Sequence, residues 1–126
     1  MFLEVMMMAQ PLRNVDEIQK NLAEFQELQR QAQVLAAQRQ QLSMQVEEIR
    51  MAEDGLAKAD KGIYRAMGPL LIETTKADAA SDLKEKKELF DMRIGVLSKQ
   101  EEKLRPRMEE LRAVLEKAIQ ESRQQK

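Results

Sequence analysis

A β-hairpin is predicted at residues 63–74, whose sequence is IYRAMGPLLIET. Gly68-Pro69 is a turn signal, and the apolar segments on either side, residues 63–67 and 70–74, are long enough for short strands. Gly62 stands just before them and interrupts the helical pattern of the preceding residues. We therefore place the hairpin at residues 61–74, between two long segments with helical periodicity.

This hairpin is predicted to join several chains to one another. Alternate side chains of a strand point to opposite faces, and both faces here are partly apolar. An isolated two-stranded hairpin is marginal in water, and its two outer edges are templates for strands from other chains. We therefore expect the hairpins of an oligomer to form a common sheet or barrel. The predicted interface residues are Ile63, Tyr64, Ala66, Met67, Gly68, Leu70, Leu71 and Ile72. The alternative is a hairpin that folds back onto its own helices.

The first helix is predicted over residues 14–60. Asn14 is a suitable N-cap with Glu17 three residues later, and neither Gly nor Pro follows until Gly55. Apolar residues recur at steps of three and four, interrupted by Arg39 and Glu53. The series is Val15, Ile18, Leu22, Phe25, Leu28, Ala32, Leu35, Leu42, Val46, Ile49 and Leu56. The step after Phe25 is three where four is due, which predicts a stammer that overwinds a coiled coil.

The second helix is predicted over residues 75–126, with Thr75 as its cap and Asp78 in the capping-box position. Steps of four and three alternate along its core series, which is typical of a coiled coil. The series is Leu83, Lys87, Phe90, Ile94, Leu97, Glu101, Leu104, Met108, Leu111, Leu115 and Ala118. Pro106 lies inside this helix, where it removes the hydrogen bond to the carbonyl of Glu102 and predicts a kink.

The fold class that follows is mainly α: a long antiparallel two-helix coiled coil joined by a single β-hairpin that oligomerises into a common sheet or barrel. The helices have matched lengths, each roughly 70 Å at about 1.5 Å per residue. Residues 1–60 carry a net charge of −4 and residues 61–126 one of +3, which favours their pairing. Four aromatic side chains among 126 residues are few for an ordinary compact core.

Residues 1–13 are predicted to form an apolar tail outside the coiled coil. We expect this tail to fray, or to be shortened by a start at Met6, Met7 or Met8. The alternative is an adhesive tip, because flexible Met side chains suit varied apolar contacts. Neither Lys nor Arg precedes the apolar run, so we do not expect a signal peptide.

The composition argues against an enzyme, a metal protein and a cofactor-binding protein. The chain has no Cys and no His, which removes thiol chemistry, the usual general base and the commonest zinc ligands. Its glycines fit no phosphate-binding loop. The net charge of −1 is unlike that of proteins that bind nucleic acids or anionic membranes. We therefore expect no catalytic, cofactor or metal site, and neither nucleic acid nor membrane as a partner.

The order of helix, single hairpin and helix, with IYRAMGPLLI at residues 63–72, resembles the beta class of prefoldin subunits. The LKEKKEL stretch at residues 83–89 and the Gln- and Leu-rich first arm add to the resemblance, which covers residues 14–120. Alpha-class subunits have two hairpins between their helices, and the connector here has room for one. Pro106 departs from the uninterrupted second arm that the family leads us to expect.

The resemblance implies a holdase, a chaperone subunit that works without ATP. Four such subunits and two alpha-class subunits would form a hetero-hexamer in the cytoplasm, with the hairpins as a β-barrel platform. The arm tips would hold unfolded proteins and pass them to a group II chaperonin. Because helix ends have low local stability, seam residues at the tips would contact these clients. The expected client-binding residues are Val15, Ile18, Leu22, Leu111, Leu115 and Ile119.

Two alternatives stay open at this point. Each expected tip residue has the ordinary role of packing inside a coiled coil. The whole chain also fits a structural adaptor, in which the hairpin is only an oligomerisation joint. An adaptor would bind one specific partner and would not protect unrelated unfolded proteins.

Overall fold

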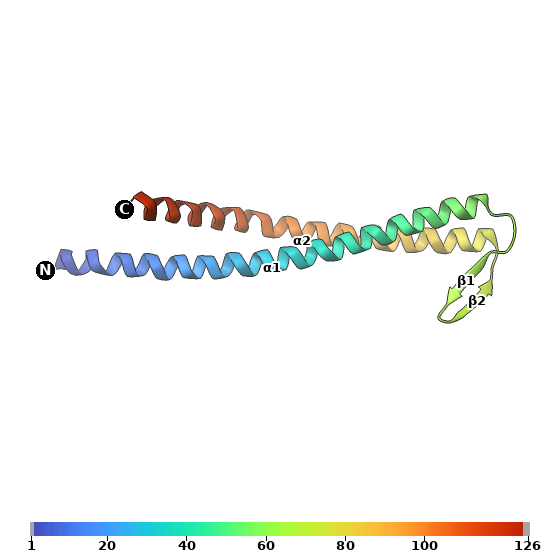
Figure 1. Cartoon of the computed structure of the whole chain (residues 1–126), viewed down its shortest axis with the longest axis horizontal. Coiled ribbons are helices and arrows are strands. Elements are labelled where there is room, and N and C mark those ends of the chain that lie inside the picture. The colour runs from blue at the N-terminus through green and yellow to red at the C-terminus, as the bar shows by residue number, and fades with distance from the viewer. Residues whose placement is uncertain (1, 125–126) are drawn as a thin grey trace. The chain divides into compact units, whose positions relative to one another are not determined.

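The structure, a computed structural model, describes the backbone of residues 2–124 and the side chains of residues 15–124. Its elements follow in the order α1 (Phe2–Lys58), β1 (Tyr64–Met67), β2 (Leu70–Glu73) and α2 (Lys76–Gln124) (Figure 1). The predicted fold of two long helices joined by a two-stranded hairpin is therefore confirmed.

The chain divides into two compact units. We call residues 36–99 the hairpin unit, and residues 1–35 with 100–126 the terminal unit. Within each unit, a stretch of α1 lies beside a stretch of α2 that runs in the opposite direction (Figure 1).

The hairpin is antiparallel and has a tight turn at Gly68-Pro69. Its register pairs Tyr64 with Glu73 and Met67 with Leu70. Gly68 has a φ of 57°, a left-handed conformation that glycine adopts without steric cost. Pro69 then fixes a negative φ, so the two turn residues fit a type II′ turn, whose twist matches that of the flanking strands.

Short-range bonds fix how the hairpin joins the helices. Thr74 N donates to Ile63 O at 2.9 Å, which extends the strand pairing by one step toward the helices. Lys76 Nζ donates to Ala57 O at 3.0 Å, and a cation at a helix C-terminus is favourable. The start of α2 is thereby tied to the end of α1.

The cap predicted at Thr75 is confirmed by its hydrogen bond. Asp78 N donates to Thr75 Oγ1 at 3.1 Å, which satisfies one of the free N–H groups of the first turn. α1, in contrast, begins at Phe2 rather than at Asn14. The residues just upstream of Asn14 include Leu12, Ala9 and Met8, which are good helix formers, but also Pro11, which is a poor one, so propensity alone does not account for this start. The side chains of residues 1–14 lie outside the described part, and the fraying of residues 1–13 stays a prediction.

One stripe of half-buried and buried side chains runs along each helix. On α2 it coincides with all the predicted positions from Leu83 to Ala118, and α2 is continuous through Pro106. On α1 it coincides with the prediction from Phe25 to Leu56. The heptad pattern therefore located the seam over most of both helices.

The stripe departs from the prediction at Leu22. Asn21 is half-buried in its place, and Leu22 is 43% exposed. The positions Ile18, Asn21, Phe25 and Leu28 then follow at steps of three, four and three, so the predicted stammer is wrong. Because the repeat stays regular, the helix is not overwound. The consequence is that the amide of Asn21 lies in the seam and Leu22 is exposed.

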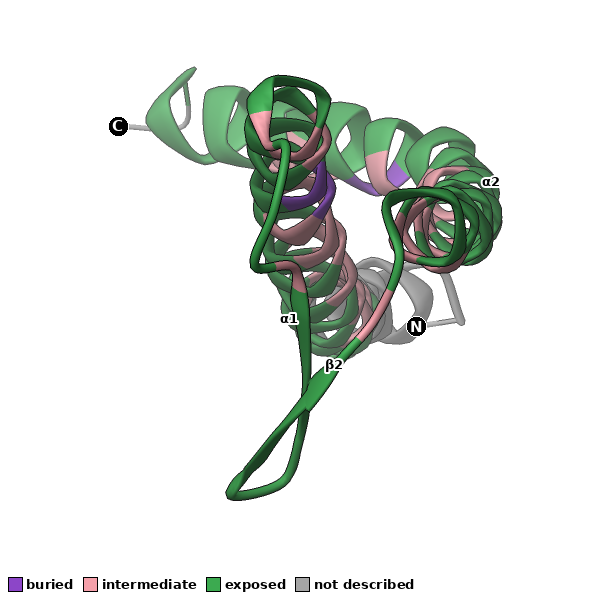
Figure 2. Ribbon diagram, turned by 90° about the vertical axis from the view of Figure 1, so that its right-hand side faces the viewer, coloured by how far each residue is buried: buried purple, intermediate pink, exposed green. Residues whose placement is uncertain are grey.

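The fully buried core of the described chain is small. It consists of Val46 and Ile49 in the hairpin unit and Leu111 in the terminal unit (purple in Figure 2). Each such side chain contributes about 1.5–3 kcal/mol when it leaves water. Two charged residues that interrupt the apolar series, Glu53 and Lys87, lie 3.5 Å apart as a half-buried ion pair. Pairing across the seam explains how a coiled coil accepts charges at these two positions.

Candidate functional site

The hairpin exposes apolar side chains on both of its faces. Every residue of β1 and β2 is exposed (green in Figure 2). The register places Arg65 and Ile72 on the face of Met67 and Leu70, and Ala66 and Leu71 on the opposite face. Leu71, at 72%, is among the most exposed of the large apolar side chains. The alternative of a hairpin packed onto its own helices is therefore wrong for the described chain.

Both outer edges of the hairpin also lack a neighbouring strand. The described sheet contains only β1 and β2, so each strand pairs on one side alone. Free backbone N–H and C=O groups of an edge can pair with a strand from another chain. The hairpin thus combines apolar faces with open edges, which are the two features that a joint between subunits needs.

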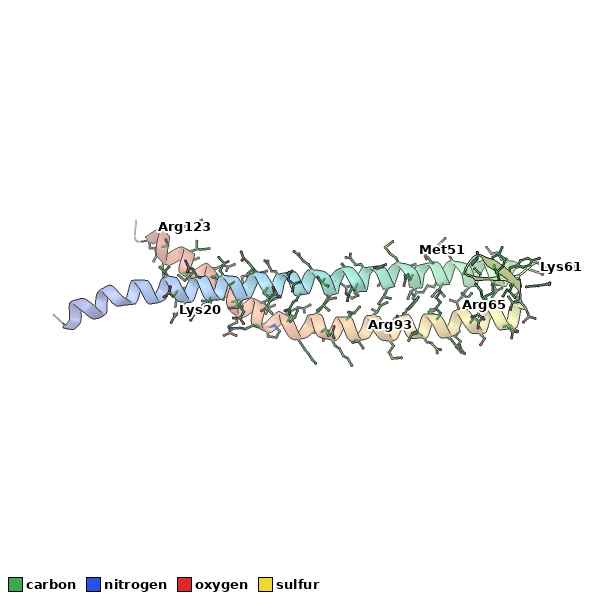
Figure 3. The ribbon with its side chains drawn as sticks, turned by 90° about the horizontal axis from the view of Figure 1, so that it is seen from below. Lys20, Met51, Lys61, Arg65, Arg93 and Arg123 are labelled. Carbon is green, nitrogen blue, oxygen red and sulfur yellow. The ribbon has the colours of Figure 1, made fainter. Side chains whose placement is uncertain are left out.

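Arg65 helps to hold the hairpin against the start of α2. Its Nη1 lies 3.1 Å from Asp82 Oδ2, and both side chains are partly exposed (Figure 3). An open cavity of about 820 Å³ lies beside this pair, with Leu56, Tyr64 and Leu83 in its lining. The hairpin therefore leaves apolar space between itself and the helices, which side chains of another chain can fill.

A second apolar surface lies between the helices of the terminal unit. We call it the tip groove, an open cavity of about 700 Å³. Its apolar lining consists of Ile18, Leu22, Phe25, Leu115, Ala118 and Ile119, and its polar lining of Gln29, Arg112, Glu116, Ser122 and Arg123. A groove with an adaptable apolar floor suits ligands that share apolar character but no fixed sequence.

Four of the expected tip residues meet in this groove. Ile18 and Leu22 come from α1, and Leu115 and Ile119 from α2. Val15 is exposed but is not part of the lining.

Leu111 corrects the set of tip residues, because it is only 1% exposed. It packs inside the seam instead of facing a ligand, which is the ordinary coiled-coil role. The reason is its place in the α2 stripe, directly before the groove lining begins at Arg112.

Sequence reasoning missed several groove residues. Phe25 and Ala118 stand on the predicted stripes, so the heptad pattern could have identified them. The charged residues Arg112, Glu116 and Arg123 carry no such signal, because their role depends on where the two helices separate.

A bidentate ion pair crosses between the helices beside the tip groove. Arg107 donates from Nε to Glu24 Oε1 and from Nη2 to Glu24 Oε2, each at 2.8 Å. Its Nη1 also lies 3.1 Å from Glu110 Oε1. The hydrogen bond from Arg107 lowers the pKa of the Glu24 carboxyl below its usual value, and the same bond raises the pKa of Arg107. Both groups therefore remain charged at neutral pH.

The described residues contain no group of three His, Cys, Asp or Glu side chains that could hold a metal ion. Within that same part of the chain, no helix is long and apolar enough to cross a membrane.

Comparison with known proteins identifies the family. Residues 19–122 match the sequence model of the family described as "Prefoldin subunit". The chain belongs to the prefoldin subunit family. That match covers both helices and the hairpin, so the family assignment rests on the whole arrangement described above.

Beta subunits of archaeal prefoldins are among the similar sequences. The prefoldin subunit beta of Thermococcus kodakarensis is 39% identical over 57 residues, which is 45% of this chain and 49% of the relative. That of Methanocella arvoryzae is 42% identical over 57 residues, 45% of each chain. The chain thus matches about half the length of these curated relatives.

The fold resembles solved beta subunits over a longer span. The crystal structure of the prefoldin beta subunit from Thermococcus strain KS-1 has a TM-score of 0.74 and 32% identity, and the match covers 81% of this chain and 91% of that one. The beta2 subunit from the same strain has a TM-score of 0.65 and 28% identity, over 70% and 96% of the two chains. The predicted resemblance to beta-class prefoldin is confirmed.

Proposed function

We propose that the chain is a subunit of an ATP-independent chaperone that holds unfolded proteins in the tip groove and passes them to a group II chaperonin. Four copies assemble with two alpha-class prefoldin subunits into a hetero-hexamer in the cytoplasm. Membership of the prefoldin family supports this chaperone role. The observation that carries the proposed mechanism is the tip groove, because α1 and the last turns of α2 present apolar side chains there without fully burying them.

The hairpin is the joint between subunits in this proposal. Its exposed side chains, its open edges and the cavity beneath it all support a role in pairing with other chains. The residues that would bury their surface in the shared platform are Ile63, Tyr64, Ala66, Met67, Gly68, Leu70, Leu71 and Ile72. A joined platform brings several tip grooves together, and several weak contacts to one client then give useful avidity.

Client binding in the groove follows from its chemistry. Leu22 and Ile119 are exposed large apolar side chains from different helices, and they line the same open space. An unfolded chain exposes apolar segments of many sequences, which an open groove accepts better than a shaped pocket. The contacts need neither a nucleotide nor a metal ion.

A variant with Leu22→Ser and Ile119→Ser tests the groove directly. Both side chains are exposed, so the change removes apolar groove surface with little effect on folding. We expect the assembled complex to lose most of its ability to suppress aggregation of an unrelated protein diluted from denaturant. The measurement is light scattering of that client at several ratios of complex to client.

The matched control replaces Val34 and Val114 with Ser. These residues belong to the terminal unit and are 44% and 43% exposed, but neither lines the tip groove. Protection should persist in this control. Full protection by the Leu22 and Ile119 variant would contradict the groove as the client site. A wild-type oligomer that protects no unfolded protein would instead favour the structural adaptor.

A further inference from the structure

The ion pair between Glu24 and Arg107 crosses between the helices of the terminal unit beside the tip groove. On α1 the groove lining runs from Ile18 to Gln29 and therefore extends on both sides of Glu24. On α2 the lining begins at Arg112, beyond Arg107. The pair therefore ties the middle of the α1 lining to the part of α2 that leads into the groove.

Apolar packing becomes looser along the groove. Leu111, one turn beyond Arg107, is fully buried, but every described side chain after it on α2 is half-buried or exposed. The seam there passes through Asn21, an amide, and Ala118, a small side chain. A polar contact across the helices adds to this limited packing in setting their separation.

The position of Pro106 next to Arg107 adds a second feature. A proline inside a helix cannot donate the backbone hydrogen bond to the carbonyl four residues earlier, here that of Glu102. α2 therefore bends at this position at a lower cost than elsewhere along its length. A flexible point and a cross-helix ion pair stand side by side on α2 just before its lining of the groove begins.

We propose that Glu24, Arg107 and Pro106 form a salt-sensitive clasp that sets how far the tip groove opens and thereby how strongly it holds a client. With the clasp closed, the α2 lining of the groove begins just after Leu111. With the clasp open, the helix ends separate further about Pro106, and half-buried lining residues such as Phe25 and Leu115 become more accessible. The effect on client binding rests on the proposed function, whereas the effect on helix separation rests on geometry alone.

Helix separation can be measured without any client. The chain has no native cysteine, so Glu17→Cys and Lys117→Cys provide two unique sites on the two helices, both exposed and outside the groove lining. Spin-labelled subunits are diluted into unlabelled complex with the alpha-class partner, and the distance between labels is measured by pulsed electron resonance. We expect Arg107→Ala and Glu24→Gln each to shift the distribution to longer distances, and the double variant to add no further shift.

Salt should reproduce the effect of the substitutions. At about 1 M ionic strength the screening length falls to about 3 Å, so the exposed pair loses most of its attraction. The wild-type distribution should then approach that of Arg107→Ala at low salt, whereas the variant should respond little. The matched control is Arg30→Ala, which removes an exposed ion pair with Glu27 inside α1 and crosses to no other helix. Unchanged distances in Arg107→Ala, or an equal shift in Arg30→Ala, would overturn the clasp.

Client affinity tests the link to function. We expect Arg107→Ala and Glu24→Gln to lower the half-saturating concentration for a labelled unfolded protein by about two- to fivefold, because the wider groove exposes more apolar surface. A change of this size matches the small free energy of an exposed ion pair. Longer distances with unchanged affinity would overturn this link and leave the proposed function intact. Absence of client binding by the wild-type complex would instead overturn the proposed function, whatever the distances show.

Discussion

The hairpin unit and the terminal unit both expose apolar side chains, but they present them in different ways. The hairpin offers a hydrogen-bonded ladder with open backbone edges, so a partner strand must pair in a fixed register. The tip groove offers side chains from two helices, and helical backbone groups pair mostly within their own helix, so the groove imposes no register. Open strand edges thus favour permanent assembly, whereas apolar side chains alone favour exchangeable, unselective binding.

The largest effect is expected at the hairpin. Leu71→Lys places a charge on a strand face that the proposed platform buries, and an unpaired buried charge is costly. We expect the oligomer with the alpha-class partner to be lost, as measured by size-exclusion chromatography with light scattering. Met51→Lys is the control, because Met51 is equally exposed at 72% but stands on α1, pointing away from α2 (Figure 3). Equal loss in both variants would remove the distinction between the hairpin and the helix surface.

The next effect is expected in the terminal unit. Leu111→Ala empties a fully buried position, and such changes cost about 2–5 kcal/mol. We expect faster amide hydrogen exchange around Leu28 and Leu104, while the oligomer keeps its mass. Val114→Ala, at an exposed position, should leave exchange unchanged. Dissociation of the oligomer in Leu111→Ala would contradict the assignment of assembly to the hairpin unit and of client binding to the terminal unit.

A smaller effect is expected at the junction of the hairpin and α2. Thr75→Ala removes the oxygen that accepts from Asp78 N, and loss of such a cap costs about 1 kcal/mol. The melting temperature of the assembled complex should fall by a few degrees by differential scanning calorimetry. Ser81→Ala, at an exposed position inside α2, should not lower it. An unchanged melting temperature in Thr75→Ala would show that assembly, and not the local cap, fixes the start of α2.

The smallest effect is expected from acid at the terminal unit. The Arg107 hydrogen bond lowers the pKa of Glu24 in the folded chain, so the unfolded chain binds its proton more readily. The stabilisation is therefore complete above the usual pKa of 4.5 and is lost as the pH falls through the lower folded value. We expect helix separation at the tip to increase over that range in the wild type. Glu24→Gln should remove this pH response. If helix separation in Glu24→Gln still increased in acid, the response would belong to another carboxylate.

Short-range sequence patterns predicted the fold, because the turn, the helix cap and the helix seam each depend on characteristic residues. Gly68-Pro69 specified the turn, Thr75 capped α2, and the heptad series placed Leu83 to Ala118 along one stripe. These features depend on neighbours in sequence, so one chain was enough to infer them. The start of α1 was less predictable, since α1 runs through both the cap signal at Asn14 and Pro11.

The tip groove was only partly predictable because burial there depends on the partner helix. Leu22 and Leu111 both belong to plausible heptad series, yet the first is exposed and the second is fully buried. A periodic pattern gives the direction of a side chain but not the point at which two helices separate. The ion pair of Glu24 with Arg107 joins residues 83 positions apart, which no local rule relates.

Native mass spectrometry of this chain co-expressed with an alpha-class prefoldin subunit tests the central claim most directly. The claim is that the hairpin joins subunits and leaves the tip grooves free for clients. We predict a six-chain species that contains four copies of this chain, and one unfolded client bound without loss of any subunit. A monomer or dimer that ignores the partner would contradict the account.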